Sequence, residues 1–139
     1  RHVQTETSHR VACWREIVHV ASVKHKHDAK KVFDLCSTAP FQEGAMECRR
    51  HAIGVLTSSS KFNLVAVAPM CKLPQKNDPD FESDCYRRIV SSTLSTLPND
   101  IARVESFCPT LSEPYRSSCS KQVAGFKISR QKATEISDD

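Results

Sequence analysis

The cysteines of this chain recur at a fixed interval, and this interval constrains the fold more than any other feature of the sequence. Twenty-two residues separate the two members of each of three successive pairs, which are Cys13 and Cys36, Cys48 and Cys71, and Cys85 and Cys108. The C-x-x-C spacing of zinc and redox sites is absent from the sequence. Widely spaced cysteines are typical of disulfides in secreted proteins, so we expect a secreted or secretory-lumen compartment.

The three segments also agree in residue type at positions other than the cysteines. Two positions after each first cysteine stands an arginine, and fifteen positions after it stands Asp or Asn, which are preferred helix N-caps. Apolar residues recur at helical spacing on both sides of this cap. Each unit is therefore predicted to be a helix, a turn and a second helix. The first helix is expected to start at the cysteine, and the second at Asp28, Asn63 or Asp100.

The expected fold class is all-α, and residues 13-128 are expected to form a single domain. It is predicted to contain three disulfide-stapled antiparallel helical hairpins, in repeats of about 35 residues, plus a terminal helix, stacked as a short solenoid or bundle. The expected units are 13-36, 48-71, 85-108 and the half unit 119-128. Residues 1-12 are interpreted as a polar N-terminal segment and residues 129-139 as a frayed polar tail.

Two disulfide maps fit this pattern. In an antiparallel hairpin the start of one helix lies beside the end of the other, and helix axes about 8–10 Å apart bring facing cysteines near bridging distance. This geometry and the constant interval favour hairpin-closing bridges Cys13–Cys36, Cys48–Cys71 and Cys85–Cys108, with Cys119 unpaired or intermolecular. The alternative closes the linkers through Cys36–Cys48, Cys71–Cys85 and Cys108–Cys119, and leaves Cys13 over. Chain entropy does not separate them, because loops of about 24 and about 13 residues contribute about 3.5 and about 2.9 kcal/mol.

Catalytic and metal-binding patterns are weak. His51 lies three residues after Cys48, but that cysteine belongs to the bridging pattern, so no catalytic residue is predicted and the protein is expected not to be an enzyme. The run HKHD at 25–28 is better explained as a solvated turn that ends in a helix cap, so we expect no metal and no cofactor. Small residues such as Ala66 and Ala68 indicate close helix contact rather than a pocket.

Positive charge is the stronger functional signal. The net charge is +4, and basic residues recur at the first turn of successive first helices, where stacking would align them as a ridge. A second basic cluster occupies the turn of the first unit. The candidate binding residues are Arg15, Arg49, Arg50, Arg87, Arg88 and Lys121 in the ridge, and Lys24, Lys26, Lys30 and Lys31 in the turn.

A basic surface of this kind attracts an acidic protein surface or a sulfated glycan. Nucleic acid is not expected, because aromatic residues that would stack on bases are not interleaved with the ridge. No apolar run reaches the length of a membrane span.

The sequence therefore predicts a non-enzymatic protein-interaction module, for adhesion, receptor binding or complex assembly, alone or within a larger extracellular protein. The alternative is a small secreted helical carrier or effector that binds an apolar ligand. The odd cysteine is a candidate for a covalent dimer or a larger complex.

Overall fold

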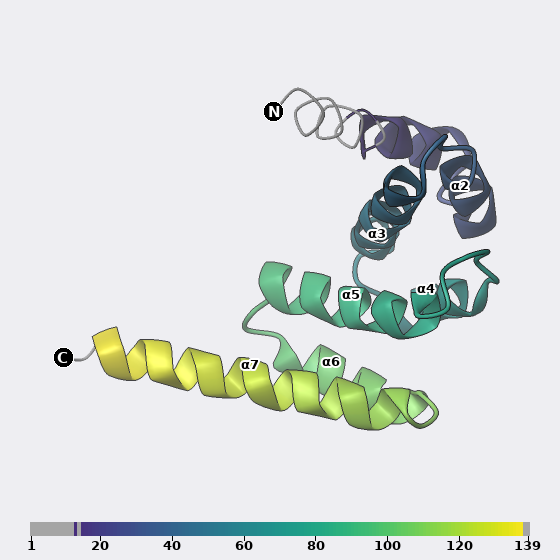
Figure 1. Cartoon of the computed structure of the whole chain (residues 1–139). Helices are drawn as coiled ribbons and strands as arrows, with labels where there is room; N and C mark the ends of the chain where they lie inside the picture. Colours follow the sequence, from purple (N-terminus) through teal and green to yellow (C-terminus); the bar gives the residue numbers. More distant parts are fainter. Residues whose placement is uncertain (1–12, 14, 138–139) are drawn as a thin grey trace, which may run out of the picture.

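Helices form all the regular secondary structure in the computed structural model, which describes residue 13 and residues 15–137 (Figure 1). The all-α prediction is confirmed for these residues, and the segment 1-12 lies outside them. The first helix covers residues 15–24. The elements that follow are α2 (Ala29–Cys36), α3 (Gln42–Ser59), α4 (Leu64–Val67), the 3₁₀ helix η1 (Ala68–Lys72), α5 (Phe81–Thr96), α6 (Ile101–Phe107), the 3₁₀ helix η2 (Cys108–Thr110) and α7 (Tyr115–Ser137).

The three predicted cap residues stand where the short helices α2, α4 and α6 begin. The Asp28 side chain accepts a hydrogen bond from the backbone N–H of Lys31 at 3.2 Å, and the Asn63 side chain accepts one from Ala66 at 3.4 Å. These bonds satisfy N–H groups that a helix start leaves without a partner. Asp100 occupies the same position before α6, but its carboxylate accepts from a guanidinium instead of a backbone N–H.

The turns before the first two caps share one backbone conformation. Lys26 and His27 have φ of 52° and 62°, and Lys61 and Phe62 have φ of 57° and 59°. In both turns the N–H of the second residue donates to the carbonyl five positions earlier, which closes a Schellman motif at the end of the preceding helix. The third turn contains Pro98, whose ring fixes a negative φ, so its path differs from the other two.

The long helices begin earlier than predicted. The sequence places their starts at a cysteine, but α3 starts six residues before Cys48, and α5 and α7 start four residues before Cys85 and Cys119. Acidic residues near the start of α5, Glu82 and Asp84, interact favourably with the positive end of the helix dipole. Each of these cysteines therefore lies at least one turn inside its helix.

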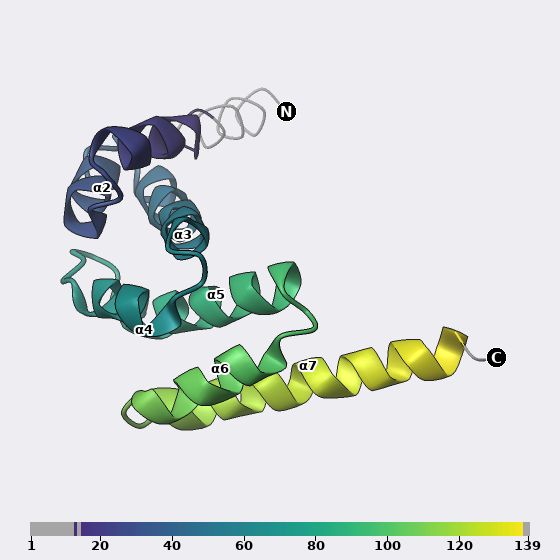
Figure 2. The same cartoon turned by 180° about the vertical axis from the view of Figure 1, so that it is seen from behind.

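Each short element packs on the long helix that follows it in the chain. The contacts pair α2 with α3, η1 with α5, and η2 with α7. The long helices also pack in order, α3 against α5 and α5 against α7. Figures 1 and 2 show α5 and α7 running in the same direction from the same end of the molecule, with α6 leading the chain back between them.

The disulfides follow this packing, and the hairpin-closing prediction is wrong. The bridges are Cys36–Cys48, Cys71–Cys85 and Cys108–Cys119, with Cα–Cα distances of 5.4, 5.3 and 5.5 Å. Cys119, predicted to be unpaired, is bridged, and Cys13 is the free cysteine among the described residues. Because the long helices begin before their cysteines, each of these cysteines meets the end of the preceding short element instead of the far helix of its own unit.

The three bridges are part of the hydrophobic core. All six bridged cysteines are at most 4 % exposed and belong to one continuous cluster of buried residues. Phe33, Ile53, Ile89 and Phe107 are the largest apolar side chains of this cluster that are almost completely buried. The covalent links therefore lie within the apolar core, away from solvent.

The helix α7 extends beyond the predicted half unit 119-128. Residues 129–137, interpreted from the sequence as part of a frayed tail, continue the helix. After Gly125 the sequence contains no Gly or Pro and several strong helix formers, which accounts for the extension. The guanidinium of Arg130 also donates to the Pro98 carbonyl and to Asn99 Oδ1, which ties α7 to the turn after α5.

Peptide mapping without reduction tests the bridge assignment. We expect peptides that join Cys36 to Cys48, Cys71 to Cys85 and Cys108 to Cys119, and about one reactive thiol per denatured chain, located at Cys13. A peptide that joins Cys13 to Cys36 would show that the bridges close the helix–turn–helix units and that the packing described above is wrong.

Candidate functional site

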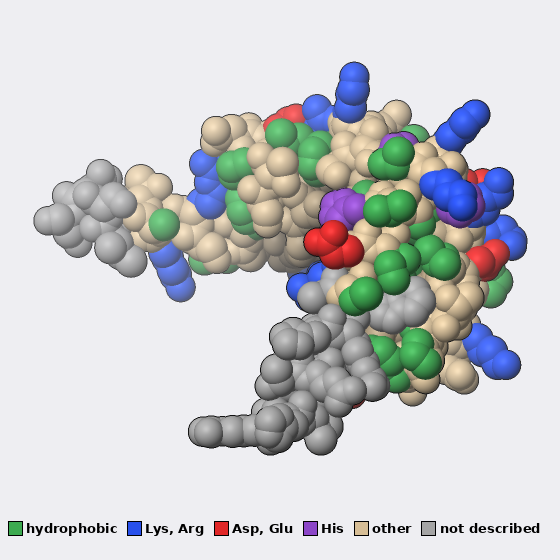
Figure 3. All heavy atoms as spheres, turned by 90° about the horizontal axis from the view of Figure 1, so that it is seen from above, with side chains coloured by type: hydrophobic (Ala, Val, Ile, Leu, Met, Phe, Trp, Pro, Cys, Tyr) green, Lys and Arg blue, Asp and Glu red, His purple; other side chains and the backbone are tan. Residues whose placement is uncertain are grey.

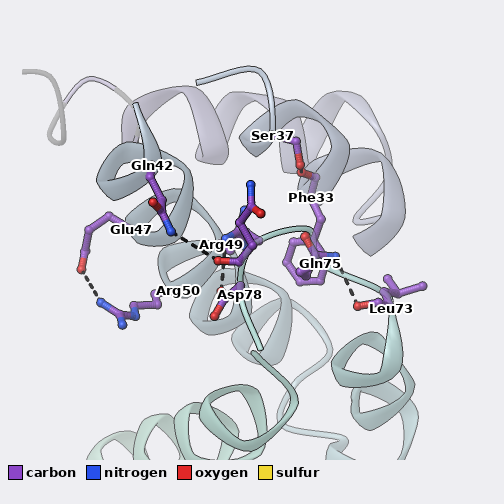
Figure 4. Close-up of polar contacts among 10 residues, drawn as sticks. Phe33, Ser37, Gln42, Glu47, Arg49, Arg50, Leu73, Gln75 and Asp78 are labelled. Atoms are coloured by element: carbon purple, nitrogen blue, oxygen red, sulfur yellow. Dashed lines mark hydrogen bonds and ion pairs between the residues drawn. The ribbon is translucent and has the colours of Figure 1, made fainter. Parts of the chain in front are cut away.

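The predicted basic ridge is largely neutralised by carboxylates. Arg49 is 4 % exposed, and its guanidinium lies 3.1 Å from the Asp78 carboxylate, so its assignment to a binding surface is wrong (Figure 4). Arg15 and Arg50 both pair with Glu47, at 3.2 and 3.3 Å. Burial alone would raise the pKa of Glu47, but hydrogen bonds from these two arginines hold it below its ordinary value.

The remaining ridge residues come from α5 and α7. Arg87 lies 3.7 Å from the Asp84 carboxylate. Arg88 and Lys121 are exposed and have no ion pair within the described part of the chain. Exposed ion pairs such as Arg87–Asp84 are screened by water and contribute at most about 1 kcal/mol each to stability. With the exception of Arg49, the role of the ridge residues in binding stays a prediction.

Positive charge is concentrated at the turn of the first unit. Lys24, Lys26 and Lys31 are exposed, and Lys30 is exposed in an ion pair with Asp34 at 3.0 Å. The segment 24–34 therefore carries four lysines against two carboxylates, those of Asp28 and Asp34. In Figure 3, Lys and Arg side chains gather beside histidines at one end of the molecule. We call residues 24–31 the basic turn.

An apolar groove of about 480 Å³ adjoins the basic turn. Its walls come from the start of α2, the end of α3, and the α4–η1 segment. Most of the lining is apolar, and His27, Asp28 and Lys30 border it on the α2 side. The apolar lining residues are Ala29, Leu56, Ala66, Val67, Pro69, Met70 and Leu73. We call this site the apolar groove.

Local sequence explains the shape of the groove. Pro69 lies in the first turn of η1, and because proline has no N–H to donate, the α-helical bonding of α4 gives way to a 3₁₀ helix there. Met70 and Cys71 then turn inward to the core. Ala66, interpreted from the sequence as a helix contact, is exposed, and its small side chain leaves the groove open. The sequence pattern does not reveal this site, because the walls come from three separate segments.

A pair of histidines joins the first helix to α3. The Nε2 atoms of His19 and His51 are 2.9 Å apart, and the two rings meet edge to face with centroids 4.7 Å apart. Burial lowers the pKa of His51, and the positive charges at His19 and Arg15 lower it further, while the Glu47 carboxylate opposes them. A hydrogen bond between two imidazole nitrogens requires that at least one ring is neutral.

The described residues contain no group of three or more side chains that could together hold a metal ion. Cys48, which lies three residues before His51 in the sequence, is bonded to Cys36 and has no thiol. The cap Asp28 uses its carboxylate on a backbone N–H, as expected from the sequence.

Comparison of the chain with protein-family models, with curated proteins and with solved structures finds no significant match. None of the helices in the described residues is long and apolar enough to cross a membrane.

The buried pair of Arg49 and Asp78 gives a direct test of the packing under α3. Their side chains are only 5 % and 10 % exposed, so Asp78→Asn leaves a buried positive charge without a counter-charge. We expect this change to lower the free energy of unfolding by about 3–5 kcal/mol, measured by urea denaturation with the disulfides intact.

Asp34→Asn is the matched control, because it breaks an exposed pair with Lys30 and should cost less than about 1 kcal/mol. Equal effects of the two substitutions would contradict the burial of Arg49.

Stability should fall on mild acidification because of His51. Its pKa in the fold lies below the unfolded value of 6.5, so the unfolded chain takes up a proton first as the pH falls through that value. The resulting loss of stability starts near pH 6.5 and stops below the folded pKa. Urea denaturation at a series of pH values should show this slope in the wild type and a smaller slope in His51→Gln.

The same substitution at His27, which lies in the exposed basic turn away from the pair, is the control for a change of slope specific to His51. An unchanged slope in His51→Gln would mean that the pair does not link protonation to folding.

Proposed function

We propose that this protein is a secreted, non-enzymatic interaction module that binds a protein segment carrying acidic and apolar side chains. The observation that carries the proposal is the position of the apolar groove beside the basic turn. A site of this kind offers an apolar centre for anchoring side chains and a charged border for orientation, which is the usual anatomy of protein interfaces.

Three disulfides support a secreted or secretory-lumen location. Such bridges form and persist in oxidising compartments and are rare where glutathione keeps thiols reduced. The free cysteine Cys13 is exposed, so a bridge to another chain, if one forms, would use this residue and not Cys119.

The bridges also favour a preformed groove. Cys36–Cys48 fixes the α2 wall to the α3 wall, and Cys71–Cys85 fixes η1 to the long helix beneath it. A wall that is already rigid loses little conformational entropy when a partner binds, which strengthens binding. The groove therefore suits an extended or helical segment that docks without rearranging the module.

The electrostatics favour an acidic segment. Carboxylates on the partner would approach Lys30 and the other lysines of the basic turn, while its apolar side chains would enter between Leu56 and Met70. Because the basic turn is exposed, its charges steer association and are screened by salt. Arg88 and Lys121, on α5 and α7, are candidates for a separate contact.

We also infer that the protein is a short helical solenoid whose repeat is offset from the cysteine-to-cysteine unit. The repeat consists of a short helix, a disulfide-closed linker and the following long helix. The shared cap positions, the shared turn geometry of the first two units, and the packing of each short element on the next long helix support this interpretation.

An apolar-ligand carrier is the second candidate, because the groove is lined mostly by apolar side chains and its volume is within the range of small-molecule sites. Carrier sites, however, enclose most of their ligand. Ala66 and Pro69 are exposed, so this groove opens to solvent, and an open apolar groove favours a protein partner.

Peptide selection tests the proposal with no assumption about the identity of the partner. The full disulfide-intact chain would be used to select binders from a random peptide library, and we expect peptides that combine Asp or Glu with large apolar residues. A synthetic selected peptide should bind more weakly to Ala66→Glu than to the wild type, by about tenfold or more, because the new carboxylate occupies the groove and repels the peptide.

Val65→Glu is the matched control, since Val65 is the neighbouring residue, is 60 % exposed and does not line this groove. Equal binding by both variants would place the binding surface elsewhere. A lipid that co-purifies with the wild type and is lost in Ala66→Glu, detected by native mass spectrometry, would favour the carrier instead.

A further inference from the structure

The contact between His19 and His51 has a geometry that suits a metal ion. His19 belongs to the first helix and His51 to α3, and their Nε2 atoms lie 2.9 Å apart. Neither imidazole ring has another hydrogen-bond partner among the described residues. His19 is exposed and His51 half-buried, so the pair borders solvent.

We propose that His19 and His51 bind a divalent transition-metal ion, with Cu²⁺ as the best fit, and that this ion joins the first helix to α3. Two ligand nitrogens about 2.0–2.1 Å from one ion are about 3.3 Å apart at a tetrahedral angle and about 2.9 Å apart at a right angle. The observed 2.9 Å is the length of a hydrogen bond, and it brings both nitrogens close to the separation that two ligands of one ion require.

Binding requires a change of protonation but no movement of the helices. In the metal-free pair one Nε2 carries the proton of the hydrogen bond and the other accepts it. Each imidazole must present a bare Nε2 to the metal, so the proton moves through solvent to Nδ1 of the same ring, and both rings stay neutral. Small rotations of the two rings then aim both lone pairs at one point, and water completes the coordination.

The charges around the pair select for a metal that binds neutral nitrogen strongly. The Glu47 carboxylate is taken up by Arg15 and Arg50, so it is not a third ligand. Two guanidinium groups and one carboxylate leave a local excess of positive charge, which weakens the binding of any cation. Affinity for imidazole rises along the series to Cu²⁺, which makes this ion the most competitive at such a site.

This site is spatially separate from the apolar groove. Neither histidine lines the apolar groove, and the pair lies on the side of α3 that faces the first helix. A metal here would act on structure, because an ion that binds only the folded chain shifts the folding equilibrium towards it.

A Cu²⁺ titration of histidine variants tests the proposal. The chain has six histidines, so the reference variant keeps only His19 and His51 and carries His2→Asn, His9→Asn, His25→Asn and His27→Asn. It also carries Cys13→Ser, because a free thiol reduces Cu²⁺. We expect this variant to bind one equivalent of Cu²⁺, with two imidazole nitrogens in the electron paramagnetic resonance spectrum and a higher melting temperature.

Adding His51→Asn to the reference variant is the matched control. It should remove the two-nitrogen signal and the rise in melting temperature while the helical circular dichroism stays the same. The proposal is overturned if the folded reference variant binds no equivalent of Cu²⁺, or if His51→Asn leaves the spectrum unchanged. If the metal proposal fails in this way, the outcome of the peptide-binding test of the apolar groove is not affected.

Discussion

The packing of this protein depends on three buried disulfides, each of which joins a short helical element to the long helix that follows it. The short helices α2, α4 and α6 have eight, four and seven residues, too few to be stable alone in water. Their caps define where they start, and the bridges hold their ends against α3, α5 and α7. Because the bridged sulfurs are buried, the same contacts provide both covalent restraint and apolar burial.

This arrangement also explains why the molecule has a groove at all. In a compact hairpin, α4 would pack closely against α3, and the space between them would be filled. Here Cys71 links η1 to α5, the next long helix, and α4 is only four residues long. The start of α2, fixed to α3 by Cys36–Cys48, closes the other side. The groove therefore lies between segments that two of the linker-closing bridges hold in place.

The sequence predicted local features well and long-range pairing poorly. Helix caps depend on a few neighbouring residues, so Asp28 and Asn63 were found from their type and position. The bridges depend on where the long helices begin, and the acidic and apolar residues before Cys48 and Cys85 were interpreted as linker instead of first turns. The burial of Arg49 was equally hidden, because its partner Asp78 lies in the next linker and nothing in the local pattern connects them.

The two proposed sites meet at α3, which makes a coupling between them physically reasonable. The basic turn directly follows the first helix, and His27 and Asp28 of that turn border the apolar groove. A metal ion at His19 and His51 would fix the first helix on α3 and so fix the position of the turn. If a partner in the groove binds the turn best in that position, each ligand strengthens the other by the same factor. The disulfide between α2 and α3 transmits no such change, because it holds its helices together with or without ligand. Any such coupling would therefore pass through the first helix, which carries His19 and leads into the basic turn.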